Sequence, residues 1–227
     1  MLERFSQMKP LEITNCLLCS PTPTPILVCM GPKAHHHIDQ SDLSDTGLRD
    51  HFLIAMPGLQ DPTFAHTIAY VCEHSAEGAM AIVINHPLEL SLNDVFAQLE
   101  FPPNHRLGRE SVLSGGPVQV ERGFVLHPSG QNWQSTLRIS PDISLTASQD
   151  ILAAMAENRG PEGAIVALGY AGWGAGQLEE EIASNAWLTV PAESHILFHT
   201  PVEQRWSAAA KHLGIDLNLI SATAGHA

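Results

Sequence analysis

The stretch HFLIAMPGLQDPTFAHTIAYVCEHSAEGAMAIVIN, residues 51–85, decides the fold class of this chain. It contains three short apolar segments, HFLIAM, HTIAYVCE and AMAIVIN, whose β-branched and aromatic residues predict strands. The turn residues of PGLQDP separate the first two segments, and HSAEG joins the second to the third as a hairpin loop would. Hairpins that follow one another without intervening helices favour an α+β fold over a doubly wound parallel sheet.

Helices and strands are mixed in the rest of the chain. The segments RGFVLH, STLRIS, GAIVALGY, AWLTVP and HILFH predict strands, whereas SLNDVFAQLE, TASQDILAAMAENRG, LEEEIASN and TPVEQRWSAAAKHLG predict helices. Ser91 with Asp94, and Thr200 with Glu203, have the spacing of helix-capping pairs. We therefore expect one α+β domain over residues 48–227.

Residues 1–47 differ from the rest of the chain in composition. They contain SPTPTP, GPKAHHH and DQSDLSD, which lack helix or strand periodicity, so we expect a disordered N-terminal extension. Cys16, Cys19 and Cys29, with His35–His37, are competent zinc ligands, but their spacing is not that of a paired zinc knuckle. A disordered tail, or sequence upstream of the true translation start, is therefore favoured over a metal site.

The charge of the chain is strongly acidic. Its 24 acidic and 11 basic residues give a formal net charge of -13. Residues from Asp61 onward hold 18 acidic and seven basic side chains, 7 - 18 = -11, and Lys211 is their only lysine. Because DNA affinity depends on lysine and arginine, we expect no direct contact with nucleic acid. No apolar run is long enough to span a membrane and no signal peptide is recognisable, which favours the cytoplasm.

The sequence contains few candidates for catalysis. It has no phosphate-binding loop, dinucleotide fingerprint or hydrolase motif, so we expect no cofactor and no metal and leave enzymatic activity open. Cys72 and His74 are two residues apart on a predicted strand, where they could form a thiolate pair on one face. A small buried cysteine is the more common role. Asp61 and Glu73 are a possible carboxylate pair that the sequence cannot bring together.

The stretch ALGYAGWGAGQLEEEIA, residues 167–183, places four glycines before a helix. Such a junction can hold a phosphate at the helix N-terminus. The spacing, however, matches no phosphate-binding motif, and Glu179–Glu181 would repel an anion from the first turn. We therefore predict a turn that needs glycine for its backbone shape, with Trp173 exposed beside it as a contact surface.

Four stretches together resemble the AlgH/YqgE family of bacterial proteins. They are residues 51–85, SGGPVQVERGFVLH, ALGYAGWGAGQLEEEIASNAWL and EQRWSAAAKHLGID, and the similarity runs from about residue 48 to the C-terminus. The resemblance implies a single cytosolic α+β domain with a barrel-like, mixed, largely antiparallel sheet flanked by helices. No established ligand or reaction comes with it. One branch takes its name from a proposed role in regulating alginate production, and the label "transcriptional regulator" has been attached to it.

Two functions remain open at this point. We prefer a regulatory protein that acts through protein partners without touching DNA. The alternative is an enzyme or small-molecule-binding protein with a pocket between the Asp61 turn and the Gly169–Gly176 loop, where Glu73, His74 and Gln177 would converge with Asp61. The expected binding or interaction surface consists of Pro57, Gly58, Asp61, Phe64, Gly115, Gly116, Pro117, Gly169, Tyr170, Gly172, Trp173, Gly174 and Gln177.

Overall fold

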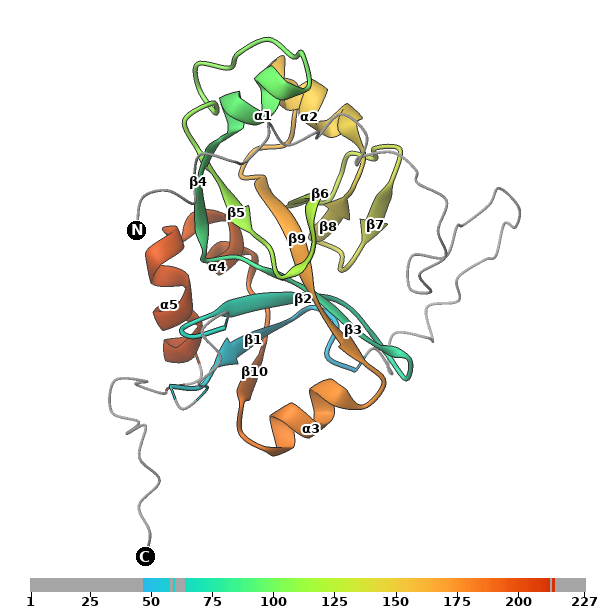
Figure 1. Ribbon diagram of the computed structural model, residues 1–227, viewed down its shortest axis with the longest axis vertical. Coiled ribbons are helices and arrows are strands. Elements are labelled where there is room, and N and C mark those ends of the chain that lie inside the picture. Colours follow the sequence, from blue (N-terminus) through green and yellow to red (C-terminus); the bar gives the residue numbers. More distant parts are fainter. Residues whose placement is uncertain (1–46, 58, 60–63, 213, 215–227) are drawn as a thin grey trace, which may run out of the picture.

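A computed structural model describes residues 47–57, 59, 64–212 and 214 of the chain (Figure 1). The predicted N-terminal extension, except Gly47, lies outside the described residues, and so do its cysteine and histidine candidates. Gly58 and Asp61, from the predicted PGLQDP turn, also lie outside them.

The described residues form ten strands, five α-helices and one short 3-10 helix (Figure 1). The strands are β1 (His51–Ala55), β2 (Ile68–Ser75), β3 (Gly78–Val83), β4 (Pro87–Ser91), β5 (Ser111–Ser114), β6 (Val118–Pro128), β7 (Thr136–Arg138), β8 (Ile143–Thr146), β9 (Ile165–Gly174) and β10 (Trp187–Pro191). The helices are α1 (Leu92–Gln98), α2 (Gln149–Ala156), α3 (Gln177–Ala183), α4 (Ser194–His199), η3 (Val202–Gln204) and α5 (Arg205–His212).

All ten strands belong to one curled sheet in which β9 is the central connection. The strand order is β10-β1-β2-β3-β9-β6-β8-β7, with β4 and β5 off this path. Residues 171–174 of β9 pair with β3, whereas residues 165–170 pair with β6. These pairings are antiparallel, and β5 lies parallel to β9. The predicted α+β domain with a mixed, largely antiparallel sheet is therefore confirmed.

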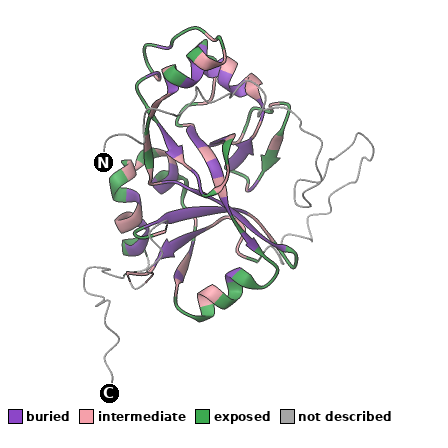
Figure 2. Cartoon of the chain, in the orientation of Figure 1, coloured by how far each residue is buried: buried purple, intermediate pink, exposed green. Residues whose placement is uncertain are grey.

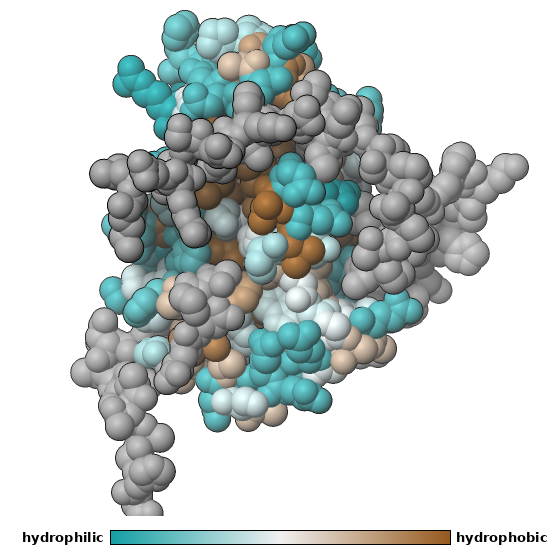
Figure 3. Space-filling view, viewed as in Figure 1, coloured by the Kyte–Doolittle hydropathy of each residue, from teal (hydrophilic) through white to brown (hydrophobic). Residues whose placement is uncertain are grey.

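The helices cover the curled sheet at three places (Figures 1 and 2). The segments α4 and α5 pack with the largest apolar cluster, which includes Phe52, Tyr70 and Ile82. At one end of the molecule α1 and α2 enclose a second cluster, and at the other end α3 covers a third. The outer surface at the end formed by α1 and α2 is largely hydrophilic (Figure 3). No helix among the described residues has the length and apolar character needed to cross a lipid bilayer.

One of the two predicted helix-capping pairs forms in the structure, and the other does not. Ser91 caps α1 in a reciprocal capping box with Asp94, as its spacing predicts. The predicted β2–β3 hairpin is also confirmed. The Thr200 cap is wrong, because Pro201 holds the N-cap position of η3 and the Thr200 hydroxyl donates instead to the backbone carbonyl of His195.

The segment HILFH is a helix and not the strand that its apolar residues suggest. It forms most of α4, in which Ile196 and Leu197 are buried while His195 and His199, one helical turn apart, are exposed. A run of five residues is too short for periodicity to separate strand from helix.

Candidate functional site

The glycine-rich stretch is mainly strand, which corrects the predicted turn. Gly169, Gly172 and Gly174 lie within β9. Only Gly176 lies between β9 and α3, at the N-cap of α3 with a φ of 74°. A conformation that favours glycine is therefore confirmed at the strand–helix junction.

A second glycine segment, Gly115–Gly116, lies directly against the backbone of β9. A Cβ added to Gly115 would stand 2.2 Å from the carbonyl oxygen of Gly169, and one added to Gly116 would stand 2.2 Å from the carbonyl carbon of Tyr170. Gly169 in turn approaches the carbonyl oxygen of Gly116, which a Cβ would meet at 2.5 Å. These glycines allow two backbones to touch, and the contact leaves no space for a ligand between them.

Trp173 is 5% exposed, which corrects the prediction that it forms an accessible contact surface. Its indole N–H donates to Oε2 of Glu181 at 2.9 Å, and the indole N–H of Trp187 donates to the same oxygen at 2.8 Å. Gln177 supports this carboxylate through a bond to Oε1, and its own amide oxygen accepts from the backbone N–H of Gly174. The indole rings of Trp173 and Trp187 thus hold α3 against the sheet through the carboxylate of Glu181.

The other residues of the expected surface fall into separate places. Phe64 packs edge-on against Trp187, with ring centres 5.6 Å apart, so it belongs to the cluster beneath α3. Tyr170 packs against Phe124 on the other side of the sheet. Pro57 is half-buried and Pro117 is exposed. The described members therefore do not form one binding surface, and a pocket beside Asp61 lies outside the described residues.

A β-bulge separates Cys72 from His74. The register between β2 and β3 shifts between Val71 and Glu73, so Cys72 lies in the core with Tyr70 whereas His74 turns to the face covered by α3. Burial raises the pKa of the Cys72 thiol above its usual range, which disfavours a thiolate. The hypothesis of a Cys72–His74 nucleophile is therefore wrong.

His74 has a structural position instead. Its Nε2 lies 2.9 Å from a carboxylate oxygen of Glu179 in α3, and its Nδ1 accepts from the backbone N–H of Leu48. His86 also contacts a polar side chain within the fold. Nε2 of His86 lies 3.3 Å from the hydroxyl of Thr67, but Thr67 is completely buried, so this pair presents no nucleophile to a substrate.

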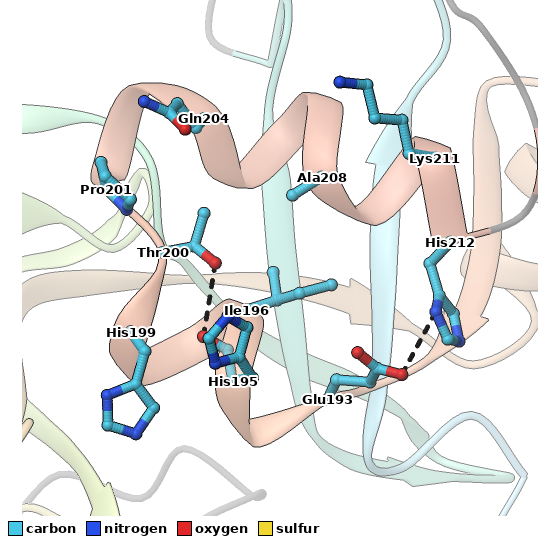
Figure 4. Close-up of a pocket in the computed structure, with 10 residues that line it drawn as sticks. All are labelled: Glu193, His195, Ile196, His199, Thr200, Pro201, Gln204, Ala208, Lys211 and His212. Carbon is cyan, nitrogen blue, oxygen red and sulfur yellow. Dashed lines mark hydrogen bonds and ion pairs between the residues drawn. The ribbon is translucent and has the colours of Figure 1, made fainter.

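A groove of about 500 Å³ lies between α4 and α5 (Figure 4). Ile196 and Ala208 supply apolar surface to it, and exposed polar side chains stand around them. The lining residues are Glu193, His195, Ile196, His199, Thr200, Pro201, Gln204, Ala208, Lys211 and His212. The groove is a wide, open depression and not an enclosed cavity, which leaves it accessible to a chain segment.

Arg205 and Trp206 hold the helices that form the groove. Arg205, only 6% exposed, donates from Nη1 to the carbonyl of Ile84 at 2.6 Å and from Nε to the carbonyl of Thr200 at 3.1 Å. Burial lowers its pKa to about 10, so the guanidinium stays charged at neutral pH. The indole N–H of Trp206 donates to the carbonyl of Ala55 at 3.3 Å. The start of α5 is therefore fixed to the ends of β1 and β3.

The groove is richer in histidine than the sequence led us to expect. Nδ1 of His212 lies 3.2 Å from Oε1 of Glu193, which joins the end of α5 to the start of α4. His195 and His199 have ring centres 5.6 Å apart, and Lys211 adds a cation. None of these residues was in the predicted surface. The i, i+4 spacing of His195 and His199 was the available signal, and it was lost when HILFH was interpreted as a strand.

Known proteins provide an independent comparison. A family model described as AlgH-like matches residues 52–218. A UPF0301 protein of Saccharophagus degradans is 56% identical over 195 residues, which cover 86% of this chain and 96% of that protein. The UPF0301 protein AlgH of Pseudomonas aeruginosa is 52% identical over 187 residues, covering 81% and 98%.

Solved structures agree with this sequence match. The solution structure of the AlgH protein from Pseudomonas aeruginosa has a TM-score of 0.68 and 52% identity, and the match covers 81% of this chain and 98% of that one. A crystal structure of protein DIP2367 from Corynebacterium diphtheriae, at 18% identity, has a TM-score of 0.60 and shares the fold. On the strength of the family match and these identities, the chain belongs to the AlgH-like family.

Proposed function

We propose that this protein is a cytosolic regulatory protein that binds a segment of a partner protein in the α4–α5 groove and makes no direct contact with DNA. The observation that carries the proposal is the groove itself, with apolar surface from Ile196 and Ala208 inside an exposed polar rim. Short chain segments are commonly recognised by surfaces that combine an apolar anchor point with polar groups around it.

The polar rim indicates what kind of segment fits. Lys211 is an exposed cation at the end of α5, whereas Glu193, the acid of the rim, already faces His212. A segment that enters the groove can therefore pair with the ammonium group of Lys211, whereas the carboxylate of Glu193 already has a partner. We propose a segment that places a small apolar side chain over Ala208 and a carboxylate toward Lys211.

A peptide library displayed on phage tests this proposal with the full chain as bait. We expect enriched peptides to share an acidic residue next to a small apolar one. Ala208→Trp fills the groove from α5 and should weaken their binding at least tenfold. Ala183→Trp, on the exposed face of α3, is the matched control and should leave binding unchanged. Equal binding by both variants, or no enrichment, would contradict the proposal.

The absence of DNA binding is a separate prediction. Several basic side chains of the described region already have partners within the molecule, namely Arg49 with the carbonyl of Ile139, Arg106 with Glu162, Arg159 with Glu157, and Arg205 with the carbonyl of Ile84. Because these side chains are already paired and the net charge is -13, few cationic groups remain to contact DNA phosphates.

Fluorescence anisotropy with a labelled promoter duplex, at low and physiological salt, measures this directly. We expect no dissociation constant below about 10⁻⁶ M at physiological salt, the tight end of non-specific binding. A nanomolar affinity that falls steeply as salt rises would show that the charge argument is wrong.

A further inference from the structure

Two imidazoles extend from the same face of α4, one helical turn apart (Figure 4). They belong to His195 and His199, both exposed, and their ring centres are 5.6 Å apart with a tilt of 31° between the planes. Histidines at positions i and i+4 of a helix are the arrangement that several zinc enzymes use to hold their ion from one helix.

The ring nitrogens of this pair have no hydrogen-bond partner within the described part of the chain. Three other histidines do have such partners: His74 binds Glu179, His127 binds Thr146, and His212 faces Glu193. The bonds of those three rings account for their positions in the fold. The lone pairs of His195 and His199 are instead available to an external ligand.

The spacing of the two rings fits a single shared metal ion. An imidazole nitrogen binds zinc at about 2.0–2.1 Å, so two rings on one tetrahedral ion have their centres about 5.2 Å apart. The observed 5.6 Å is close to this distance, and a small rotation of either exposed side chain would bring the rings to it. Because the described residues contain no group of three or more His, Cys, Asp or Glu placed to hold a metal, the chain would supply two ligands and leave the other positions open.

We propose that His195 and His199 together bind a divalent transition-metal ion of the zinc class, with water in the remaining positions. Imidazole suits zinc, copper and nickel, and the expected order of affinity is copper above nickel above cobalt, with magnesium not bound. The proposal is independent of a partner segment, since it needs only the two rings of one chain.

Nuclear magnetic resonance of the isotope-labelled full chain, titrated with Co²⁺ alone, tests this site directly. The readout is specific to position, so ions bound by cysteines and histidines of residues 1–46 do not obscure it. We expect paramagnetic shifts centred on the amides of residues 194–200, with none from Mg²⁺ at the same concentration. Zn²⁺ should displace Co²⁺ and abolish these shifts.

Matched variants separate the pair from histidine in general. His195→Gln and His199→Gln should each weaken Co²⁺ binding at α4 at least tenfold, because either change leaves a single ligand. His105→Gln removes an exposed histidine elsewhere and should change nothing. All three side chains are exposed, so the melting temperature of each variant should match that of the parent protein. This match would exclude misfolding as the cause of weaker binding. Unshifted α4 amides in the parent, or equal binding by the His195 variant, would overturn the proposal.

Discussion

Gly116→Ala is expected to lower the free energy of unfolding by about 3 kcal/mol or more, the largest loss we expect from adding one methyl group. The φ of Gly116 is 148°, which a residue with a Cβ rarely adopts, and the Cβ would lie 2.2 Å from the carbonyl carbon of Tyr170. Overpacking costs about 1–3 kcal/mol and a strained backbone adds a similar amount. The obstacle is backbone of β9, which cannot turn aside as a side chain would. Urea unfolding followed by tryptophan fluorescence measures the difference.

Two other glycines, at the junction between β9 and α3, provide controls. Gly176→Ala introduces a Cβ with nothing within 4 Å but keeps a φ of 74°, so strain alone should cost about 1 kcal/mol. At Gly174 the nearest atom to an added Cβ is Oε1 of Gln177 at 3.9 Å, and Gly174→Ala should be close to neutral. If Gly116→Ala were no worse than Gly174→Ala, the backbone contact would not have the role that we assign to it.

Trp173→Ala is expected to cost about 3–5 kcal/mol of unfolding free energy, the usual range for a buried large aromatic residue. The ring packs edge-on against Trp187, with centres 6.0 Å apart, and its removal leaves a cavity under α3. Glu181 also loses one of the two indole donors to its Oε2 atom. Calorimetric and chemical unfolding should agree on the loss.

A graded series tests the cause of that loss. Trp173→Phe keeps much of the apolar volume but removes the indole N–H, so its cost should lie between that of the parent protein and Trp173→Ala. Val120→Ala shortens a side chain that is 57% exposed and should change stability by less than about 0.5 kcal/mol. A Trp173→Ala protein as stable as the Val120→Ala protein would contradict the buried position of the ring.

The parts of the fold that the sequence predicts correctly are those decided by neighbours in the chain. The capping box of Ser91 and Asp94 needs only four consecutive residues, and the β2–β3 hairpin needs a short turn between two apolar segments. The resemblance to a known family supplied the curled shape of the sheet, which no local pattern contains.

Three of the errors arose where a distant segment decides the outcome. Residue spacing placed Cys72 and His74 on one face, but an irregular pairing with β3 turns them apart. The glycines of β9 suggested a turn. In the structure, however, position 169 has no space for a side chain because residues 115–116 lie against it. Trp173 looked exposed among glycines, yet it is covered by α3 and joined to Glu181. No window of the sequence contains these partners.

The candidate groove was missed for a related reason. Its two sides, α4 and α5, each have a simple pattern, but their relative position depends on Arg205 reaching the carbonyl of Ile84, 121 residues away along the chain. With α4 interpreted as a strand, His195 and His199 would lie on one side but about 13 Å apart. The helix brings their ring centres to 5.6 Å.

The pairing of β1 with β10 has a consequence for the order in which the chain is synthesised. His51 lies opposite Pro191, so the first strand of the described residues finds its outer neighbour only when the last described strand has left the ribosome. The central strand β9, which joins β3 to β6, is also made late, after residue 164. The nascent chain therefore carries hairpins that lack their permanent neighbours for most of translation, and the described sheet can be completed only after residue 191 has been made.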